Sequence, residues 1–490
     1  MTRRTAPGVF AVVLLAAAPA AQHYQTDFPP EEFRARWNAV FDRIGPEGVA
    51  VLQGVPMTNG YILPRQHNSF YYLSGIETPE SYLVLDGRTR RVTLYLPPRN
   101  AALESAEGRV LSADDADLVK RLTGVDDVQS AATMTQGNWP VGGQGRGGRG
   151  SGPRVQAIYA EFEPPEGYAQ SRGELRAGDR SISSDPFDGR LPRQQQLVAR
   201  LAGRATEIRS LNPILDELRS VKSPREIALV RKASQLAGLG MMEAIRSTEP
   251  GVREYQLEAA ARYIFILNGA RMDAYRSITA AGNANILNMH YFRNADELRD
   301  GDWVLMDYAP DYRYYVSDIG RMWPVNGTFA PWQRELLQFV LEYRNAVMTR
   351  VRPGVTTAAI RQEAATAMEA VFARTKFSKP VYEAAARRLV EGGGGVFSHG
   401  VGLAVHDVGS YQNGPLRPGQ VFSIDPQLRV PEEGLYVRYE DTVVVTDTGV
   451  ENFTDFLPSE LVDIETLVRE KGIVQMYPAV LELPDRLRIR

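Results

Sequence analysis

The stretch Trp303-Val304-Leu305-Met306-Asp307 is an apolar run that ends in a carboxylate. The same pattern recurs where residues 421–424 precede Asp425 and where residues 435–439 precede Glu440. Short apolar runs of this kind predict buried strands. Strand interiors disfavour Asp and Glu, and burying an unpaired carboxylate is costly, so these acids indicate a shared cationic partner at the strand ends. The alternative is that each acid is an exposed turn residue.

Two further residues extend this pattern. Asp318 follows the run 314–317, and His399 lies in a glycine-rich segment. Two divalent cations would balance the four carboxylates, and oxygen ligands with one imidazole favour Mn²⁺, with Zn²⁺ or Co²⁺ as alternatives. A pair of such ions activates water and polarises a carbonyl group, which is hydrolytic chemistry. Spacing alone gives the metal site and the exposed turns about equal weight.

The composition restricts the class of protein. The chain has 490 residues, with 56 Lys and Arg against 59 Asp and Glu, and this length accommodates two or three domains. Hydrophobic residues make up 43% and charged residues 23%, which is typical of a globular protein and not of a disordered one. The formal charge of −3 argues against nucleic acid as a partner. Because cysteine is absent, any metal site must use oxygen and imidazole ligands.

The first residues have the pattern of an export signal. Arg3 and Arg4 precede an apolar core over residues 9–18, and Ala18-Pro19-Ala20 resembles a cleavage site. The alternative is a membrane anchor, but this core is too short to span about 30 Å of hydrocarbon. We therefore expect a signal peptide over residues 1–21, no stable membrane insertion after its cleavage, and a periplasmic or secreted protein.

The first half of the mature chain predicts a mixed α/β domain over residues 28–210. Its pattern indicates a helix that follows Pro29 and strands at 48–53, 81–85 and 91–96. Helical patterns follow at 101–125 and 191–210, and a glycine-rich loop lies near 142–153.

The second half predicts a second domain of alternating strands and helices over 215–470 and a carboxy-terminal tail over 471–490. Ser223, Pro224 and Glu226 have the pattern of a capped helix start, and the apolar spacing extends this helix to about residue 247. Further helices are expected between 251 and 269, at 331–351 and at 356–373, with another strand at 442–446. The expected fold class is α/β (α+β).

Six stretches resemble the pita-bread metallopeptidases, specifically the Xaa-Pro aminopeptidase (aminopeptidase P) group. They are residues 65–75, 288–290, 304–309, 317–321, 398–409 and 437–441. The resemblance implies an amino-terminal mixed α/β domain followed by a pita-bread catalytic domain. It also implies a homo-oligomer that removes the amino-terminal residue from peptides whose second residue is proline.

The resemblance assigns roles by position. Asp307 would bind one metal ion, Asp318 and Glu440 would bridge two ions, and His399 and Asp425 would bind the other. Substrate and catalytic roles fall to four residues: His290 and His406 at the peptide or its developing oxyanion, Asp425 as general base, and Arg438 either beside the proline or as a support behind the metal ligands.

Several positions depart from the family pattern. Asp425 stands where the family has Glu, Gly395 where it usually has a substrate-contacting His, and Gly320 where Thr is common. Gln427-Leu428-Arg429 also replaces the usual Gly-Leu-Tyr. These departures make strict selection of proline less secure than hydrolysis, and they leave two alternatives open. One is a prolidase-type dipeptidase or a peptidase of altered specificity, and the other is a catalytically silent peptide-binding protein. We expect His67 to be structural or to lie between domains, and the alternative is an approach to the active site of a neighbouring subunit.

Overall fold

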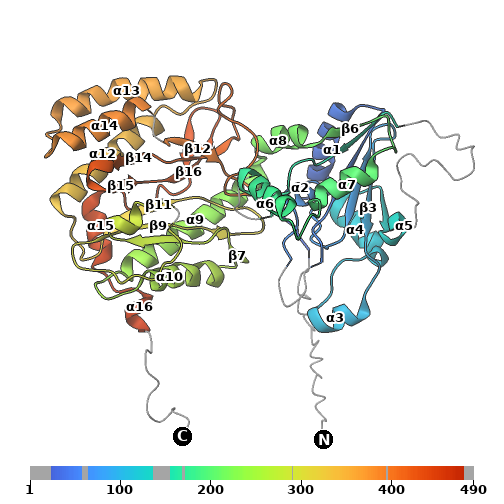
Figure 1. The fold of residues 1–490 in the computed structure, drawn as a ribbon, viewed down its shortest axis with the longest axis horizontal. Coiled ribbons are helices and arrows are strands. Elements are labelled where there is room, and N and C mark those ends of the chain that lie inside the picture. Colours follow the sequence, from blue (N-terminus) through green and yellow to red (C-terminus); the bar gives the residue numbers. More distant parts are fainter. Residues whose placement is uncertain are drawn as a thin grey trace, which may run out of the picture.

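The computed structural model describes residues 24–57, 64–135, 155–167, 172–289, 291–392 and 395–478. The expected signal peptide, the glycine-rich loop and His290 lie outside the described residues. Figure 1 shows two lobes, with α6 and α8 near their junction. No helix among the described residues is long and apolar enough to cross a membrane.

The amino-terminal lobe is built on one mixed sheet with the strand order β4-β3-β2-β1-β5-β6. Strands β1, β2 and β3 pair antiparallel, whereas β4, β5 and β6 join in parallel register. The strands are β1 (Gly48–Gln53), β2 (Tyr82–Asp86), β3 (Arg91–Leu96), β4 (Asp127–Ser130), β5 (Ala157–Ala160) and β6 (Glu207–Ser210). The helices are α1 (Pro30–Ile44), α2 (Asn68–Ser74), α3 (Ala101–Glu107), α4 (Ala116–Thr123), α5 (Ala132–Thr135), α6 (Arg172–Ser184), α7 (Arg193–Leu201) and α8 (Asn212–Ser220).

The catalytic lobe contains two main sheets, β11-β9-β8 and β12-β13-β16-β17, with the short pairs β7–β10 and β14–β15. Helix α10 packs on β8, and α12 and α14 pack on the β14–β15 hairpin, so helices cover both sides of the strands (Figure 1). The strands are β7 (Met272–Asp273), β8 (Ile278–Ala281), β9 (Trp303–Asp307), β10 (Pro310–Asp311), β11 (Gly320–Pro324), β12 (Phe397–Gly400), β13 (Val421–Ile424), β14 (Gln427–Val430), β15 (Leu435–Arg438), β16 (Asp441–Val445) and β17 (Val450–Asn452). The helices are α9 (Pro224–Arg246), α10 (Glu254–Leu267), α11 (Asn283–Ile286), α12 (Pro331–Met348), α13 (Thr357–Arg374), α14 (Pro380–Gly392), α15 (Leu461–Val468) and α16 (Ile473–Met476).

A continuous apolar core joins the two lobes. Phe33 and Trp37 of α1 belong to the same buried cluster as Tyr315 and Val401 of the catalytic lobe. The rings of Tyr71 and Tyr314 stack across the junction with centroids 3.7 Å apart. Burying this apolar surface stabilises the contact between the lobes, so the catalytic residues lie on a rigid frame.

Most strands and helices predicted from the pattern are confirmed, and two predictions are wrong. Ser223 caps α9 and Glu226 completes the capping box, as expected. The helix predicted over 191–210 ends at Leu201, because Glu207–Ser210 forms β6 and pairs with β5. The helix predicted over 101–125 is interrupted at Gly108, whose φ of 93° is not helical.

Candidate active site

The acids that follow the apolar runs lie close together in the catalytic lobe. Asp307 ends β9 and pairs with Gly320 of β11, and Gly320 in turn forms a bridge with Glu440. These pairings place the two acids on either side of Gly320. Asp307 is 2% exposed and Glu440 is fully buried, so the alternative of exposed turns is wrong for this pair.

Asp318 is the centre of two groups of possible ligand atoms. Carboxylate oxygens of Asp307, Asp318 and Glu440 all lie within 4.8 Å of one another. Asp318 also forms a group of the same size with ring nitrogens of His399 and His406, and His399 Nε2 lies 3.1 Å from Asp318 Oδ2. Two neighbouring cation positions that share Asp318 therefore fit the described residues.

Asp425 belongs to neither of these two groups. Its buried carboxylate accepts hydrogen bonds from Arg438 Nε at 2.8 Å and from Gln427 Nε2. Arg438 also donates to Asp307 through Nη1 at 2.5 Å and contacts Glu440. The guanidinium thus joins three of the four predicted carboxylate ligands. The ligand role of Asp425 stays a prediction.

Burial and mutual repulsion disfavour the ionised forms of three of the four carboxyl groups in this site. Burial raises the pKa of Asp307 to about 8 against the opposing effect of Arg438, with Asp318 adding repulsion. Burial also raises the pKa of Asp425 and, to a larger extent, that of Glu440. Burial would raise the pKa of Asp318 too, but the hydrogen bond and charge of His399 hold it below its ordinary value.

The residues present fit divalent metal ions. Oε1 of Glu440 is buried without a hydrogen-bond partner in the described structure, which is costly unless a cation occupies the site. Carboxylates and imidazole are ligands for Mn²⁺, Zn²⁺ and Co²⁺. A divalent ion would also offset the repulsion that raises the pKa of the neighbouring acids.

Two residues that sequence reasoning missed hold the site together. The hydroxyl of Tyr275 donates to Asp307 Oδ1 at 2.5 Å and lies 2.9 Å from Asp318 Oδ1. Thr442 Oγ1 accepts from the backbone N–H of Asp318 at 3.0 Å and donates to its carbonyl at 2.7 Å. Neither residue lies in a motif, and both are found only from the pairing of distant strands.

A cavity of about 290 Å³ gives access to this site. Asp307, Asp318, Arg438 and His406 form its polar wall. The remaining lining residues are Glu174, Tyr275, Arg276, Ser277, Ile278, Tyr291, Phe292 and Val405. His67 lies elsewhere, in the amino-terminal lobe, where its Nδ1–H donates to the Gln53 carbonyl at 3.2 Å.

A mixed α/β fold that brings buried carboxylates together with half-buried imidazoles is typical of a metal-dependent hydrolase. Residues 228–447 match Metallopeptidase family M24, and residues 33–137 match the N-terminal domain of aminopeptidase P. The Xaa-Pro aminopeptidase of Escherichia coli (strain K12) is 30% identical over 461 residues, which cover 89% of this chain and 97% of the relative.

Solved structures agree with these matches. Aminopeptidase P from E. coli with the inhibitor Pro-Leu superposes with a TM-score of 0.71 at 27% identity, covering 90% of this chain and 99% of that chain. A zinc-substituted form of the E. coli enzyme with bound product gives a TM-score of 0.69 at 26% identity over the same shares. The chain belongs to the aminopeptidase P group of Metallopeptidase family M24. The predicted fold and family are therefore confirmed.

Proposed function

We propose that this chain is an exported, dinuclear metal-dependent Xaa-Pro aminopeptidase, which releases the amino-terminal residue from peptides with proline second. The position of Asp318 is the main support for this proposal. Asp318 belongs to both groups of possible ligand atoms, and it lines the cavity. The names of the relatives support the substrate class, because the E. coli enzyme is an Xaa-Pro aminopeptidase and binds Pro-Leu as an inhibitor.

Five residues would hold the metal ions: Asp307, Asp318, His399, Asp425 and Glu440. His406, although it belongs to one of the two groups around Asp318, would face the peptide instead. Bound divalent ions would polarise the peptide carbonyl and lower the pKa of water. Mn²⁺ is the ion we propose, with Zn²⁺ and Co²⁺ as alternatives, because the ligand set is rich in carboxylate oxygen. For Asp425 to contribute a ligand atom, its carboxylate must release one of its bonds to Arg438 and Gln427.

Three residues have proposed roles in substrate binding and proton transfer. His406 lines the cavity beside the ligand residues, where an imidazole N–H can donate to the oxyanion that develops as water attacks the peptide carbonyl. Asp425 is buried and its pKa is raised, so its carboxylate suits the acceptance of the proton that water loses. His290, assigned to the substrate by resemblance, lies outside the described residues.

The cavity also offers a site for the proline ring. Ile278 and Phe292 supply apolar surface within reach of the polar wall formed by Asp307 and His406. A pyrrolidine ring buries apolar area without the rotamer entropy of an open side chain, so such a wall favours proline. Arg438 contacts three carboxylates. We propose that these contacts hold the polar wall of the cavity in place opposite the proline ring.

A peptide panel tests the activity. We expect the purified protein, after titration with Mn²⁺, to release the first residue of Xaa-Pro-Yaa peptides and to leave Xaa-Ala-Yaa peptides largely intact. Cleavage of Xaa-Pro dipeptides alone would favour a prolidase, and cleavage of both tripeptide classes would indicate altered specificity. Binding of peptides without release of an amino acid would overturn the enzyme proposal in favour of a silent peptide-binding protein.

Export and assembly need separate measurements. We expect residues 1–21 to be removed on secretion, so amino-terminal sequencing of the mature protein should begin at Gln22. An intact amino terminus in the cytoplasmic fraction would contradict this localisation.

We also propose a homo-oligomer, for which light scattering should give a mass above the 54.4 kDa of one chain.

A further inference from the structure

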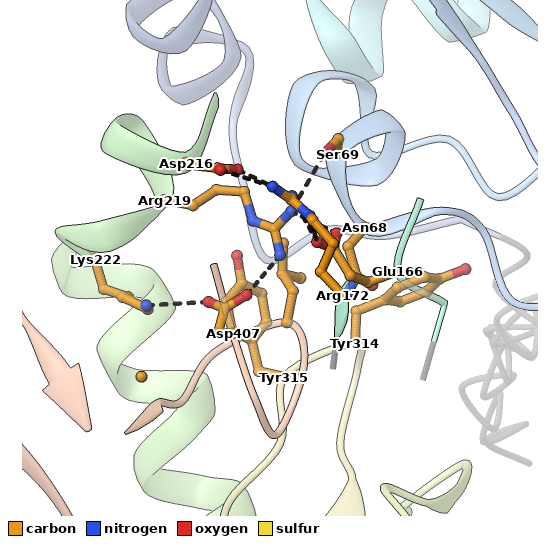
Figure 2. Close-up of polar contacts among 12 residues, drawn as sticks. Asn68, Ser69, Glu166, Arg172, Asp216, Arg219, Lys222, Tyr314, Tyr315 and Asp407 are labelled. Carbon is orange, nitrogen blue, oxygen red and sulfur yellow. Dashed lines mark hydrogen bonds and ion pairs between the residues drawn. The ribbon is translucent and has the colours of Figure 1, made fainter. Parts of the chain in front are cut away.

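A chain of buried ion pairs leads from the amino-terminal lobe to the residue that follows His406. Asp407 is 1% exposed at its side chain, and its two oxygens lie 2.5 Å from Arg219 Nη2 and 3.1 Å from Lys222 Nζ (Figure 2). Arg219 lies in the last turn of α8, and Lys222 lies between α8 and α9. The segment that connects the two lobes therefore holds Asp407 through two cations.

The chain continues into the amino-terminal lobe. Arg219 Nη1 contacts Glu166 Oε2 at 3.1 Å and Ser69 Oγ at 3.2 Å. Glu166 also pairs with Arg172 Nη2 at 2.6 Å, and Arg172 reaches Asp216 of α8 at 2.7 Å (Figure 2). Three acids and three bases alternate along this path, so their formal charges balance.

Asp407 is bonded to the loop that also carries His406. The N–H of Asp407 donates to the carbonyl of Gly400 at 2.9 Å, which closes the loop after β12. A Cβ at Gly402 would lie 2.2 Å from Asp407 Oδ2, so glycine is required for the carboxylate to fold back under this loop. The ring of His406 lies 3.9 Å from that of His399 between centroids, close to the proposed metal ligands.

We propose that Glu166 of the amino-terminal lobe is a positioning residue for His406 and acts through Arg219 and Asp407. This inference rests on the proposed function, because it concerns the residue assigned to the developing oxyanion. Buried ion pairs are rigid when every partner is present, and removal of one partner leaves an uncompensated charge. The ion pairs keep Asp407 in place, and this fixes the orientation of the neighbouring His406 ring toward the cavity. In this account the amino-terminal lobe contributes to turnover as well as to the frame.

A double-mutant cycle tests this role directly. Glu166→Gln keeps the shape of the side chain but removes the charge that faces Arg219. In the Mn²⁺-loaded enzyme we expect it to lower kcat by about tenfold while KM changes little. In a His406→Ala background the same substitution should lower kcat by less than about twofold, because the residue through which it acts is missing. An equal loss in both backgrounds would overturn the proposal.

Glu226→Gln is the matched control. Glu226 is also a buried carboxylate at the junction, where it lies 3.6 Å from Arg36 of α1 and accepts a hydrogen bond from Tyr315 at 2.8 Å. It takes no part in the chain that ends at Asp407. Because each substitution removes a buried charge from an ion pair, we expect both Glu226→Gln and Glu166→Gln to lower the unfolding temperature, but only Glu226→Gln to keep the wild-type kcat. A matching loss of kcat would mean that any damage to the junction suffices.

A spectroscopic readout separates this inference from the peptidase activity. The chain has five histidines, so ¹⁵N-histidine labelling of the Zn²⁺-loaded protein gives few signals, and the His406→Ala spectrum assigns one of them. Glu166→Gln should shift the His406 signals, and Glu226→Gln should not. Unshifted His406 signals would refute the inference even in an active enzyme. Conversely, a shift in a protein without peptidase activity would support the positioning role and reject the proposed function.

A milder substitution covers the case in which Glu166→Gln does not fold. Ser69→Ala removes the hydroxyl that accepts a hydrogen bond from Arg219 Nη1 and leaves every charge in place. We expect a fall in kcat of about two- to threefold, since Arg219 loses one hydrogen-bond acceptor but keeps both of its carboxylate partners. The His406 signals should move in the same direction as in Glu166→Gln. Wild-type kcat together with unshifted signals in Ser69→Ala would count against the proposal.

Discussion

The side chain of Gln427 fills the space beside Gly395. A Cβ built on Gly395 would lie 3.0 Å from both Cδ and Nε2 of Gln427, and the φ of 73° at Gly395 also disfavours other residues. From this position Gln427 Nε2 donates to Asp425. Three departures from the family pattern are thus spatially linked, because Gln427 takes the space next to Gly395, where the family has a histidine, and donates to Asp425, the shorter acid.

Substitution of Gln427 tests this link. Gln427→Ala removes one of the two donors to Asp425, and we expect kcat/KM to fall by about tenfold because a buried acceptor loses its partner. Gln427→Glu keeps the shape but places a second carboxylate against Asp425, so its loss should be larger. Steady-state kinetics on one Xaa-Pro-Yaa peptide measure both effects. Wild-type activity in Gln427→Glu would contradict the proposed contact.

Restoring the usual acid at position 425 tests whether the site has adapted to aspartate. The carboxylate of Asp425 is fully buried and both its oxygens are bonded, so an added methylene overpacks the site. We expect Asp425→Glu to lose activity and about 1–3 kcal/mol of stability. Combining it with Gln427→Gly should recover part of both losses. Higher activity in the single variant would instead identify Asp425 as an impairment.

Metal binding should release protons at neutral pH. Burial raises the pKa of Asp307 to about 8 in the metal-free protein, so this carboxyl group is largely protonated at about pH 7. A divalent cation favours the ionised form and displaces that proton. Calorimetric titrations with Mn²⁺ in two buffers of different ionisation enthalpy measure the release. Equal apparent enthalpies in both buffers would mean that no proton leaves.

Glu161 should make the protein less stable as the pH rises. Burial, with repulsion from Glu166, raises its pKa from 4.5 to about 7. Between these values the folded state keeps a proton that the unfolded state has lost, so the free energy of unfolding falls by about 3 kcal/mol as the pH rises through this range. Glu161→Gln should therefore be more stable than wild type in urea at about pH 8 and similar to it at about pH 4.5.

His67 should change the stability with pH in the opposite direction to Glu161. Burial lowers its pKa from 6.5 to about 4, so the unfolded state binds a proton first and stability falls as the pH drops through that range. His67→Asn should remove this loss and leave the stability at about pH 8 little changed. If both substitutions altered stability equally at every pH, the titration of Glu161 and His67 would not be the cause.

The sequence was sufficient to predict the acids at the strand ends, because an apolar run followed by a carboxylate is a local pattern. Asp307 and Glu440 were found in this way, and strand pairing brings them together. Tyr275 and Gln427 were not assigned roles, since their contacts depend on tertiary packing. The helix predicted over 191–210 was wrong at its end because pairing with β5 overrides the local pattern there.

The metal content of the purified chain tests the central claim most directly. After equilibrium dialysis against Mn²⁺, we expect elemental analysis to find two ions per wild-type chain. Asp318→Asn, which removes the carboxylate that both groups of ligand atoms share, should reduce binding at both positions. One ion or none in the wild-type protein, or two ions retained by Asp318→Asn, would contradict a dinuclear site centred on Asp318.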